Sequence, residues 1–219
     1  MAKIKSSSLG LFSGKIGNVV TYITRGKNIV RIYTDTVANP NTNKQQLVRA
    51  RFAALGKLSS DFLGAIDLGF AYRAKQRRNF PANNFMMANW EAVSASSADD
   101  VTVDYASMKL AAGPLSEVEF GTPDWGAQEH LTIAVPFTDN TGAPRTDAND
   151  EVYIFAYVPE LGQGVLSTAS TRSTASVSIT VPTSWNGMTA HLWGFTVGQG
   201  SATAGTVSDS VYIGNGEVA

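Results

Sequence analysis

Apolar and polar residues alternate in two runs near the start of the chain, NVVTYIT and NIVRIYT. The polar residues Arg25, Gly26 and Lys27 separate the two runs. Alternation is the pattern of a half-buried strand, and two such runs around a short loop that contains glycine are typical of a β-hairpin. The pattern therefore predicts a hairpin over residues 18–34.

A helical pattern follows the hairpin. Asn41 and Thr42 are candidate N-caps, and the next apolar positions share one helical face: Leu47, Val48, Phe52 and Leu55. Gly56 and Gly64 disfavour a single unbroken helix, because an interior glycine costs about 1 kcal/mol relative to alanine. We expect at least two helices here, and another in FPANNFMMANWEAV, where Pro81 stands near the start.

The pattern changes from helical to alternating after the stretch SASSADD. We place a domain boundary there, between residues 1–98 and 99–219. Seven alternating runs follow: TVDYASMKLA, HLTIAVPF, EVYIFAYV, GVLSTAS, SVSITVP, TAHLWGFTVG and VSDSVYIG. Such strands are typical of a sandwich of two sheets. We therefore predict an α+β protein, with an N-terminal β-hairpin plus helices followed by a C-terminal immunoglobulin-like β-sandwich. Its inward side chains would include Ile133, Val135, Ile154, Ile179, Leu192 and Phe195.

The charge of the chain reverses near the same point. Residues 1–95 hold 14 basic and 4 acidic residues, a net charge of +10, whereas residues 96–219 hold 3 basic and 14 acidic residues, a net charge of −11. Opposite potentials steer protein surfaces together. The charge pattern thus favours association, either between copies of the chain or with a neighbouring protein.

No motif indicates catalysis. GLFSGKIGNVV is similar to a phosphate-binding loop, but Gly10 and Gly14 are too close together, and Ile16 stands where a hydroxyl must reach magnesium. We expect Gly10, Gly14 and Gly17 to allow tight turns instead. The chain has no cysteine, which excludes thiolate metal sites. We predict no enzyme activity, no catalytic residue, no cofactor and no metal.

Three further groups have weaker functional interpretations. His130 and His191 have no companion at metal-ligand spacing, and the chain has no G-x-S-x-G motif for a serine nucleophile. The loop TDANDE, residues 146–151, fits a solvated loop better than a calcium-binding loop. Trp125 and Trp185, in predicted turns, would stack on sugars if the sandwich were an adhesive or carbohydrate-binding module, but we favour packing in the core or at an interface for the tryptophans. We keep that module as the alternative function.

Basic residues supply the predicted partner-binding site. AYRAKQRRNF contains four of them, and in a helix Arg73 and Arg77 would share one face. Basic residues near aromatic rings can also bind nucleic acid, but the chain has no recognised nucleic-acid motif, so we favour a protein partner. The N-terminal arm, residues 1–13, would be ordered on a neighbouring molecule, adding a strand to its sheet. The predicted partner-binding residues are Lys3, Lys5, Lys15, Arg73, Lys75, Arg77 and Arg78.

Several stretches across the chain resemble a family of uncharacterised proteins of about this size from Bacteroidota and their phages. They are GLFSGKIGNVVTY, PNTNKQQLVRARF, YASMKLAAGPL, VPTSWNGMTAHLWGF and VSDSVYIGNGEV. The resemblance implies a phage or prophage setting and carries no activity and no site residues.

Together these patterns predict a non-enzymatic structural subunit of a phage particle, such as a ring, neck or tail component. The expected partners are further copies of the chain and neighbouring virion proteins, with nucleic acid as a less favoured partner. No apolar run approaches the length of a membrane span or of a secretory signal. We therefore expect no membrane contact and a location in the virion, after assembly in the host cytoplasm.

Overall fold

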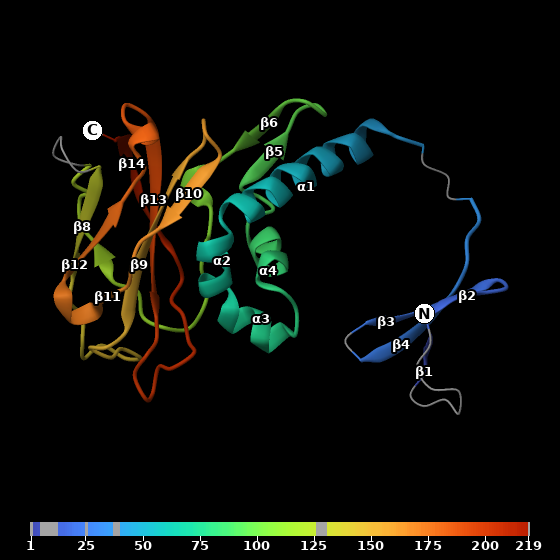
Figure 1. The fold of residues 1–219 in the computed structure, drawn as a ribbon, viewed down its shortest axis with the longest axis horizontal. Helices are drawn as coiled ribbons and strands as arrows, with labels where there is room; N and C mark the ends of the chain where they lie inside the picture. The colour runs from blue at the N-terminus through green and yellow to red at the C-terminus, as the bar shows by residue number, and fades with distance from the viewer. Residues whose placement is uncertain (1, 5–12, 25, 37–39, 126–130, 219) are drawn as a thin grey trace. The chain divides into compact units, whose positions relative to one another are not determined.

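The chain forms two compact units, Met1–Thr42 and Asn43–Ala219, in the computed structural model (Figure 1). The structure describes residues 2–4, 13–24, 26–36, 40–125 and 131–218. The boundary that we predicted between residues 98 and 99 lies inside the second unit, where helices and strands share one core.

The first unit is an antiparallel sheet with the strand order β1-β4-β3-β2. Its strands are β1 (Ala2–Ile4), β2 (Gly14–Ile16), β3 (Val19–Thr24) and β4 (Lys27–Ile32). The predicted hairpin is confirmed as β3 and β4. Gly17, with a φ of 57°, lies in the turn between β2 and β3, where a positive φ favours glycine. Strand β1 belongs to the predicted arm, and it pairs with β4 of its own sheet, so the prediction that residues 2–4 add to a neighbour's sheet is wrong.

Four helices open the second unit: α1 (Asn43–Asp61), α2 (Leu63–Gly69), α3 (Ala71–Arg77) and α4 (Pro81–Ala88). Pro81 occupies the first turn of α4, as predicted, because proline has no N–H to donate there. The expectation of at least two helices is confirmed: helix α1 continues through Gly56, and Phe62 separates it from α2.

Ten strands follow the helices in the described part of the second unit. They are β5 (Val93–Ala95), β6 (Val101–Val103), β7 (Glu119–Phe120), β8 (Thr132–Thr138), β9 (Glu151–Val158), β10 (Gln163–Leu166), β11 (Ser170–Thr171), β12 (Ser176–Thr180), β13 (Thr189–Val197) and β14 (Val211–Glu217). The predicted strand over residues 102–111 ends at Val103. Asp104 caps a 3₁₀ turn over Tyr105–Ser107 by accepting the backbone N–H groups of Ala106 and Ser107, which ends the extended conformation.

These strands form two larger antiparallel sheets and the β5–β6 hairpin. The central sheet has the order β10-β9-β13-β14, with β11 also paired to β9, and the smaller sheet has the order β12-β8-β7. Side chains from the facing sides of both sheets fill one core, which includes Ile133, Val135, Ile154, Ile179 and Leu192 as predicted. The α+β class is therefore confirmed, with two packed sheets in the C-terminal half.

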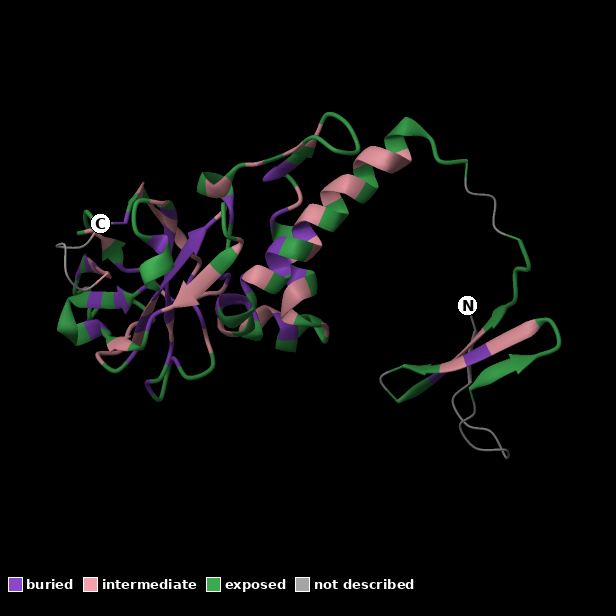
Figure 2. Ribbon diagram, turned by 45° about the horizontal axis from the view of Figure 1, so that its top comes forward, coloured by how far each residue is buried: buried purple, intermediate pink, exposed green. Residues whose placement is uncertain are grey.

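The helices cover the other face of the central sheet. Alternate residues of β9 point to opposite faces, so Phe155 and Tyr157 contact Phe62 of the helical layer while Ile154 lies in the core between the sheets. Phe195 also faces the helices, and its predicted place between the sheets is wrong. Buried residues gather along these central strands, whereas the first turns of α1 are half-buried or exposed (Figure 2).

Candidate interaction surfaces

The two faces of the N-terminal sheet differ in their exposed side chains, since one exposes isoleucines and the other exposes basic residues. Residues paired directly across antiparallel strands share a face, and the pairing places Ile16, Val19 and Ile32 in one row. The exposed fractions are 61% for Ile16 and 78% for Ile32. Ile23 lies on the same face of β3, beyond the buried Thr21, and is 45% exposed. We call these isoleucines and Val19 the apolar sheet face.

The opposite face carries the positive charge of this sheet. Lys15, Val20 and Arg31 form the matching row, and the Lys15 ammonium lies 3.5 Å from the centroid of the Tyr33 ring, a cation–π contact. Of the predicted arm residues, Lys15 is thus placed on the basic face. Lys3 belongs to β1, but its side chain lies outside the described part of the structure, and so does Lys5.

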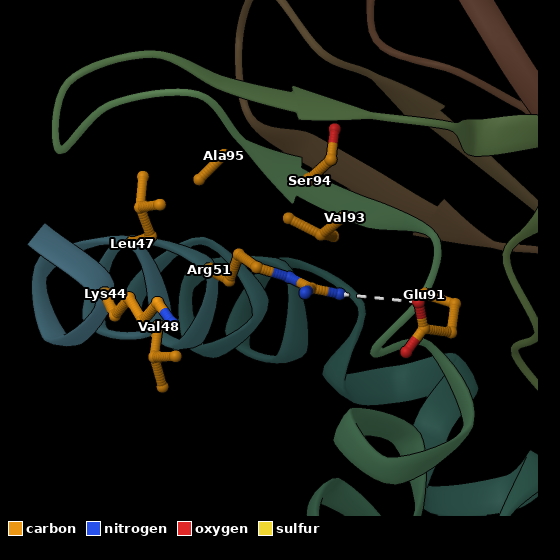
Figure 3. Close-up of a pocket in the computed structure, with 8 residues that line it drawn as sticks. All are labelled: Lys44, Leu47, Val48, Arg51, Glu91, Val93, Ser94 and Ala95. Carbon is orange, nitrogen blue, oxygen red and sulfur yellow. Dashed lines mark ion pairs between the residues drawn. The ribbon is translucent and has the colours of Figure 1, made fainter.

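A groove lies between the first turns of α1 and strand β5 (Figure 3). Its volume is about 420 Å³, and it is lined by Lys44, Leu47, Val48, Arg51, Glu91, Val93, Ser94 and Ala95. Most of the lining is apolar, with basic residues along the helix side and Glu91 at one end. No pattern that we used in the sequence indicated this groove, because it depends on two segments that are about 45 residues apart.

Arg51 joins the two walls of this groove. Its guanidinium lies over the Trp90 ring at 4.4 Å from the centroid, donates a hydrogen bond to the Trp90 carbonyl oxygen and lies 3.9 Å from the Glu91 carboxylate. The Glu91 side chain is 92% exposed, so water weakens that ion pair. The stacking and the carbonyl bond therefore hold Arg51 mainly as a structural link between α1 and the segment before β5.

The predicted basic cluster lies on and just after α3. Arg73 and Arg77 are one turn apart and line the same hollow, as the helical spacing predicted. Lys75 is exposed and lines none of the hollows found beside α3. Arg78 caps α3 with a φ of 53°. The structure thus brings two of the four basic residues together.

The candidate sugar platform does not form. Trp185 is fully buried in the core between the sheets, and its indole N–H donates to the Gln163 side chain at 3.2 Å. The predicted turn at Trp185 is confirmed as the 3₁₀ turn over Thr183–Trp185, and the burial of the ring agrees with the favoured packing role rather than with sugar stacking. Trp125 packs against the backbone at Gly216.

The TDANDE loop is held by a buried ion pair. Asp150 and Arg172 are both 0% exposed and approach to 3.5 Å. Asp150 also accepts hydrogen bonds from the backbone N–H of Asp147 and from the Thr203 hydroxyl. Asp150 was predicted to be solvated and is instead a structural residue that ties three loops together. Among the described residues, no cluster of three or more His, Asp or Glu side chains could hold a metal ion.

His191 belongs to a group of aromatic rings on the helix-covered face of the central sheet. Its Nδ1 lies 2.9 Å from the Tyr212 hydroxyl, and its ring centroid lies 4.5 Å from that of Tyr105. Burial lowers the pKa of His191, which favours the neutral imidazole. Among the described residues, the hydrogen-bond partner of this imidazole is the Tyr212 hydroxyl and not a carboxylate.

The comparisons with known proteins are consistent with the sequence resemblance at the level of the family. A model described as "Family of unknown function (DUF6266)" matches residues 11–214. The match extends over most of the chain and across both compact units. No curated protein and no solved structure gives a significant match. Among the described helices, none combines the length and the hydropathy that a bilayer span requires.

Proposed function

Since the chain belongs to the DUF6266 family of unknown function, we propose its function from the molecule itself: it is a non-enzymatic structural subunit of a phage particle, which assembles through its N-terminal sheet. The observation that carries this proposal is the apolar sheet face. A sheet with one apolar face has to bury that face against another layer.

The described side chains of the N-terminal sheet form no apolar core. Among its described side chains, only Thr21 and Asn28 are buried, and both are polar. A small single-layer sheet is marginally stable in water, and full burial of an isoleucine side chain contributes about 1.5–3 kcal/mol. Ile16, Ile23 and Ile32 therefore provide a strong driving force for docking on a second layer.

We propose that a neighbouring subunit supplies this second layer. The charges of the two units support docking of the N-terminal sheet of one copy on the larger unit of another. Residues 1–42 hold six basic residues and one acidic residue, whereas residues 43–219 hold 11 basic and 17 acidic residues. The sheet is thus basic and the larger unit is acidic, which favours their association. Exchange of an N-terminal element between neighbours is an economical way to build a homo-oligomer.

The finer parts of the proposal rest on the sequence. The resemblance to proteins of Bacteroidota and their phages supports a place in the virion, as a ring, neck or tail component assembled in the host cytoplasm. We also propose that the two packed sheets are immunoglobulin-like. The core that β8, β9, β12 and β13 share supports this assignment.

Thiol labelling tests the docking of the sheet. The chain has no cysteine, so Ile32→Cys introduces a single thiol on the apolar sheet face, and Thr24→Cys introduces one on the opposite face as a matched control. We expect a bulky maleimide to modify Ile32→Cys slowly at high protein concentration and rapidly after dilution. Thr24→Cys should react rapidly at every concentration.

The concentration dependence separates the two ways of covering the sheet. Protection of Ile32→Cys that does not change on dilution would mean that the chain covers its own sheet. Rapid labelling at all concentrations would mean that copies of the chain do not cover it. Either result would contradict self-assembly through this face.

A further inference from the structure

Two hollows meet beside α3, on both sides of the same pair of arginines. One has a volume of about 320 Å³ and is lined by Tyr72, Arg73, Gln76, Arg77, Gly113 and Pro114. The other has a volume of about 230 Å³ and is lined by Phe70, Arg73, Arg77, Asn84, Met87 and Ala88. No acidic side chain belongs to either lining. We call this surface the arginine hollow.

The positive charge of the arginine hollow has no counter-charge within the described part of the chain. The ion pairs found there join Arg51 to Glu91 and Arg172 to Asp150, and neither includes Arg73 or Arg77. Among the described residues, Arg77 donates two long hydrogen bonds, to the Asn84 amide oxygen at 3.4 Å and to the Met87 sulfur at 3.9 Å, and neither acceptor is charged. Arginine presents a planar set of donors that fits a carboxylate with two hydrogen bonds. The surface is therefore suited to a pair of carboxylates.

The turn of the β5–β6 hairpin carries such a pair. Asp99 and Asp100 are both exposed, and the turn that holds them is ordered by its own serines. The Ser97 hydroxyl accepts the backbone N–H groups of both aspartates, and the Ser96 hydroxyl bonds the Asp100 carboxylate. Neither aspartate belongs to an ion pair among the described residues. We call this turn, residues 96–100, the acidic tip.

The acidic tip and the arginine hollow lie at opposite ends of the helical layer. The β5–β6 hairpin extends beside the first turns of α1, whereas α3 lies at the far end of the same layer (Figure 1). The two surfaces therefore cannot meet within one chain. Each copy presents one of each, so a contact between them is head to tail. Such a contact closes into a ring or continues as a filament.

We propose that the acidic tip of one copy binds in the arginine hollow of the next copy, with Asp99 and Asp100 facing Arg73 and Arg77. This contact rests on the proposed function, because it names a second copy as the partner. It uses a surface separate from the N-terminal sheet. Arg145, which donates to the Pro114 carbonyl at 3.2 Å, adds further positive charge at the rim.

Reversal and exchange of charge test the contact in the full chain. One variant carries Arg73→Glu and Arg77→Glu, and the other carries Asp99→Arg and Asp100→Arg. Each variant alone places like charges together, so we expect association measured by light scattering to weaken at least about tenfold. In an equimolar mixture the two variants can alternate, so that each tip faces a hollow of opposite charge. The mixture should therefore recover the wild-type mass. Lys75→Glu, on the same helix but outside the hollow, is the matched control and should assemble normally.

Site-specific crosslinking gives a second readout that does not depend on charge. A chain with Ala98→Cys in the acidic tip and a chain with Gln76→Cys in the arginine hollow should form a mixed disulfide dimer under mild oxidation. Either variant alone should form little dimer. Failure of the mixed charge variants to associate, together with absence of the mixed disulfide, would overturn the proposal. So would a monomeric wild type at all concentrations.

The experiments separate this contact from the proposed function and from nucleic-acid binding. If Ile32→Cys is protected in a concentration-dependent way but the charge variants assemble like the wild type, the contact is overturned and the proposed function stands. Recovery in the mixture without that protection would overturn docking of the sheet and leave the contact standing. Loss of binding to duplex DNA in Arg73→Glu/Arg77→Glu, with unchanged mass, would identify the arginine hollow as a nucleic-acid surface and overturn the contact.

Discussion

The ring of Phe62 meets the ring of Tyr157 edge to face, with centroids 4.6 Å apart and an angle of 80° between the planes. Phe62 lies between α1 and α2, and Tyr157 belongs to β9. Phe62 also contacts Phe85 of α4, Phe155 of β9 and Trp193 of β13 at centroid distances of 5.1–5.9 Å. One side chain thus joins the helical layer to the two central strands of the sheet.

Truncation of this ring should destabilise the whole second unit. Phe62 is 0% exposed, so we expect Phe62→Ala to lower the free energy of unfolding by about 3–5 kcal/mol through lost burial and a cavity. Urea denaturation followed by tryptophan fluorescence measures the change. Phe52→Ala, at a position 56% exposed in α1, is the control and should change the free energy by less than about 0.5 kcal/mol. Similar effects of the two substitutions would contradict this packing.

Two glycines of α2 should respond to alanine in opposite directions. A Cβ added at Gly69 would lie 2.2 Å from the backbone oxygen of Leu110, whereas a Cβ at Gly64 would meet nothing within 4 Å. We expect Gly69→Ala to destabilise the protein by about 1–3 kcal/mol, because the helix and the 110–112 segment must separate. Gly64→Ala should stabilise it by up to about 1 kcal/mol through helix propensity. Thermal unfolding of both variants is the measurement, and destabilisation by Gly64→Ala would count against the open surface there.

Replacing only one member of the buried pair Arg172–Asp150 should destabilise the protein strongly, whereas replacing both members should cost less than the sum of the single substitutions. We expect Arg172→Met alone to destabilise the protein by about 3–5 kcal/mol, because the Asp150 carboxylate then lacks its cation. The double variant Arg172→Met/Asp150→Asn should lose less than the sum of the two single variants. A double-mutant cycle in urea measures the coupling, and additive effects would show that the two groups do not depend on each other.

Acid should weaken the protein in part through His191. Burial lowers the pKa of His191 below its ordinary value of about 6.5, so below that pH the unfolded chain binds more protons than the native protein does. The stability that the neutral imidazole contributes is present above about pH 6.5 and is lost as the pH falls through the lowered pKa. We expect the urea midpoint to fall less between pH 7.5 and pH 5 in His191→Gln than in the wild type. An equal fall would contradict the shift.

The sequence predicted the elements of this fold better than their contacts. The run EVYIFAYV was correctly predicted as a strand, and β9 has the bounds Glu151–Val158. The run is apolar at nearly every position, which is the pattern of a strand covered on both faces, but we read it as one layer of a sandwich alone. For that reason Phe195 was placed between the sheets. The separation of helices from strands at residue 98 followed composition, whereas Phe62 and Tyr157 unite them.

The candidate surfaces were predictable only where one element carries them. The helical spacing of Arg73 and Arg77 predicted their common face, because positions four apart are neighbours on a helix. Lys75 and Arg78 could be seen in advance to diverge from that face. The lack of carboxylates beside the arginines depends on tertiary packing and has no local signal. The burial of Asp150 has the same origin, since its partner Arg172 is 22 positions away.

The order of synthesis has a consequence for the helical layer. Phe85 leaves the ribosome 108 residues before Trp193 (193 minus 85), and β9 and β13 cover the helices only when both strands are present. At about 5–20 residues per second, this interval lasts roughly 5–20 seconds. During it, the apolar sides of α1, α2 and α4 have no sheet to cover them, so we expect the nascent chain to expose the phenylalanines that the folded protein buries. Each copy of the chain passes through this stage before its helical layer is covered.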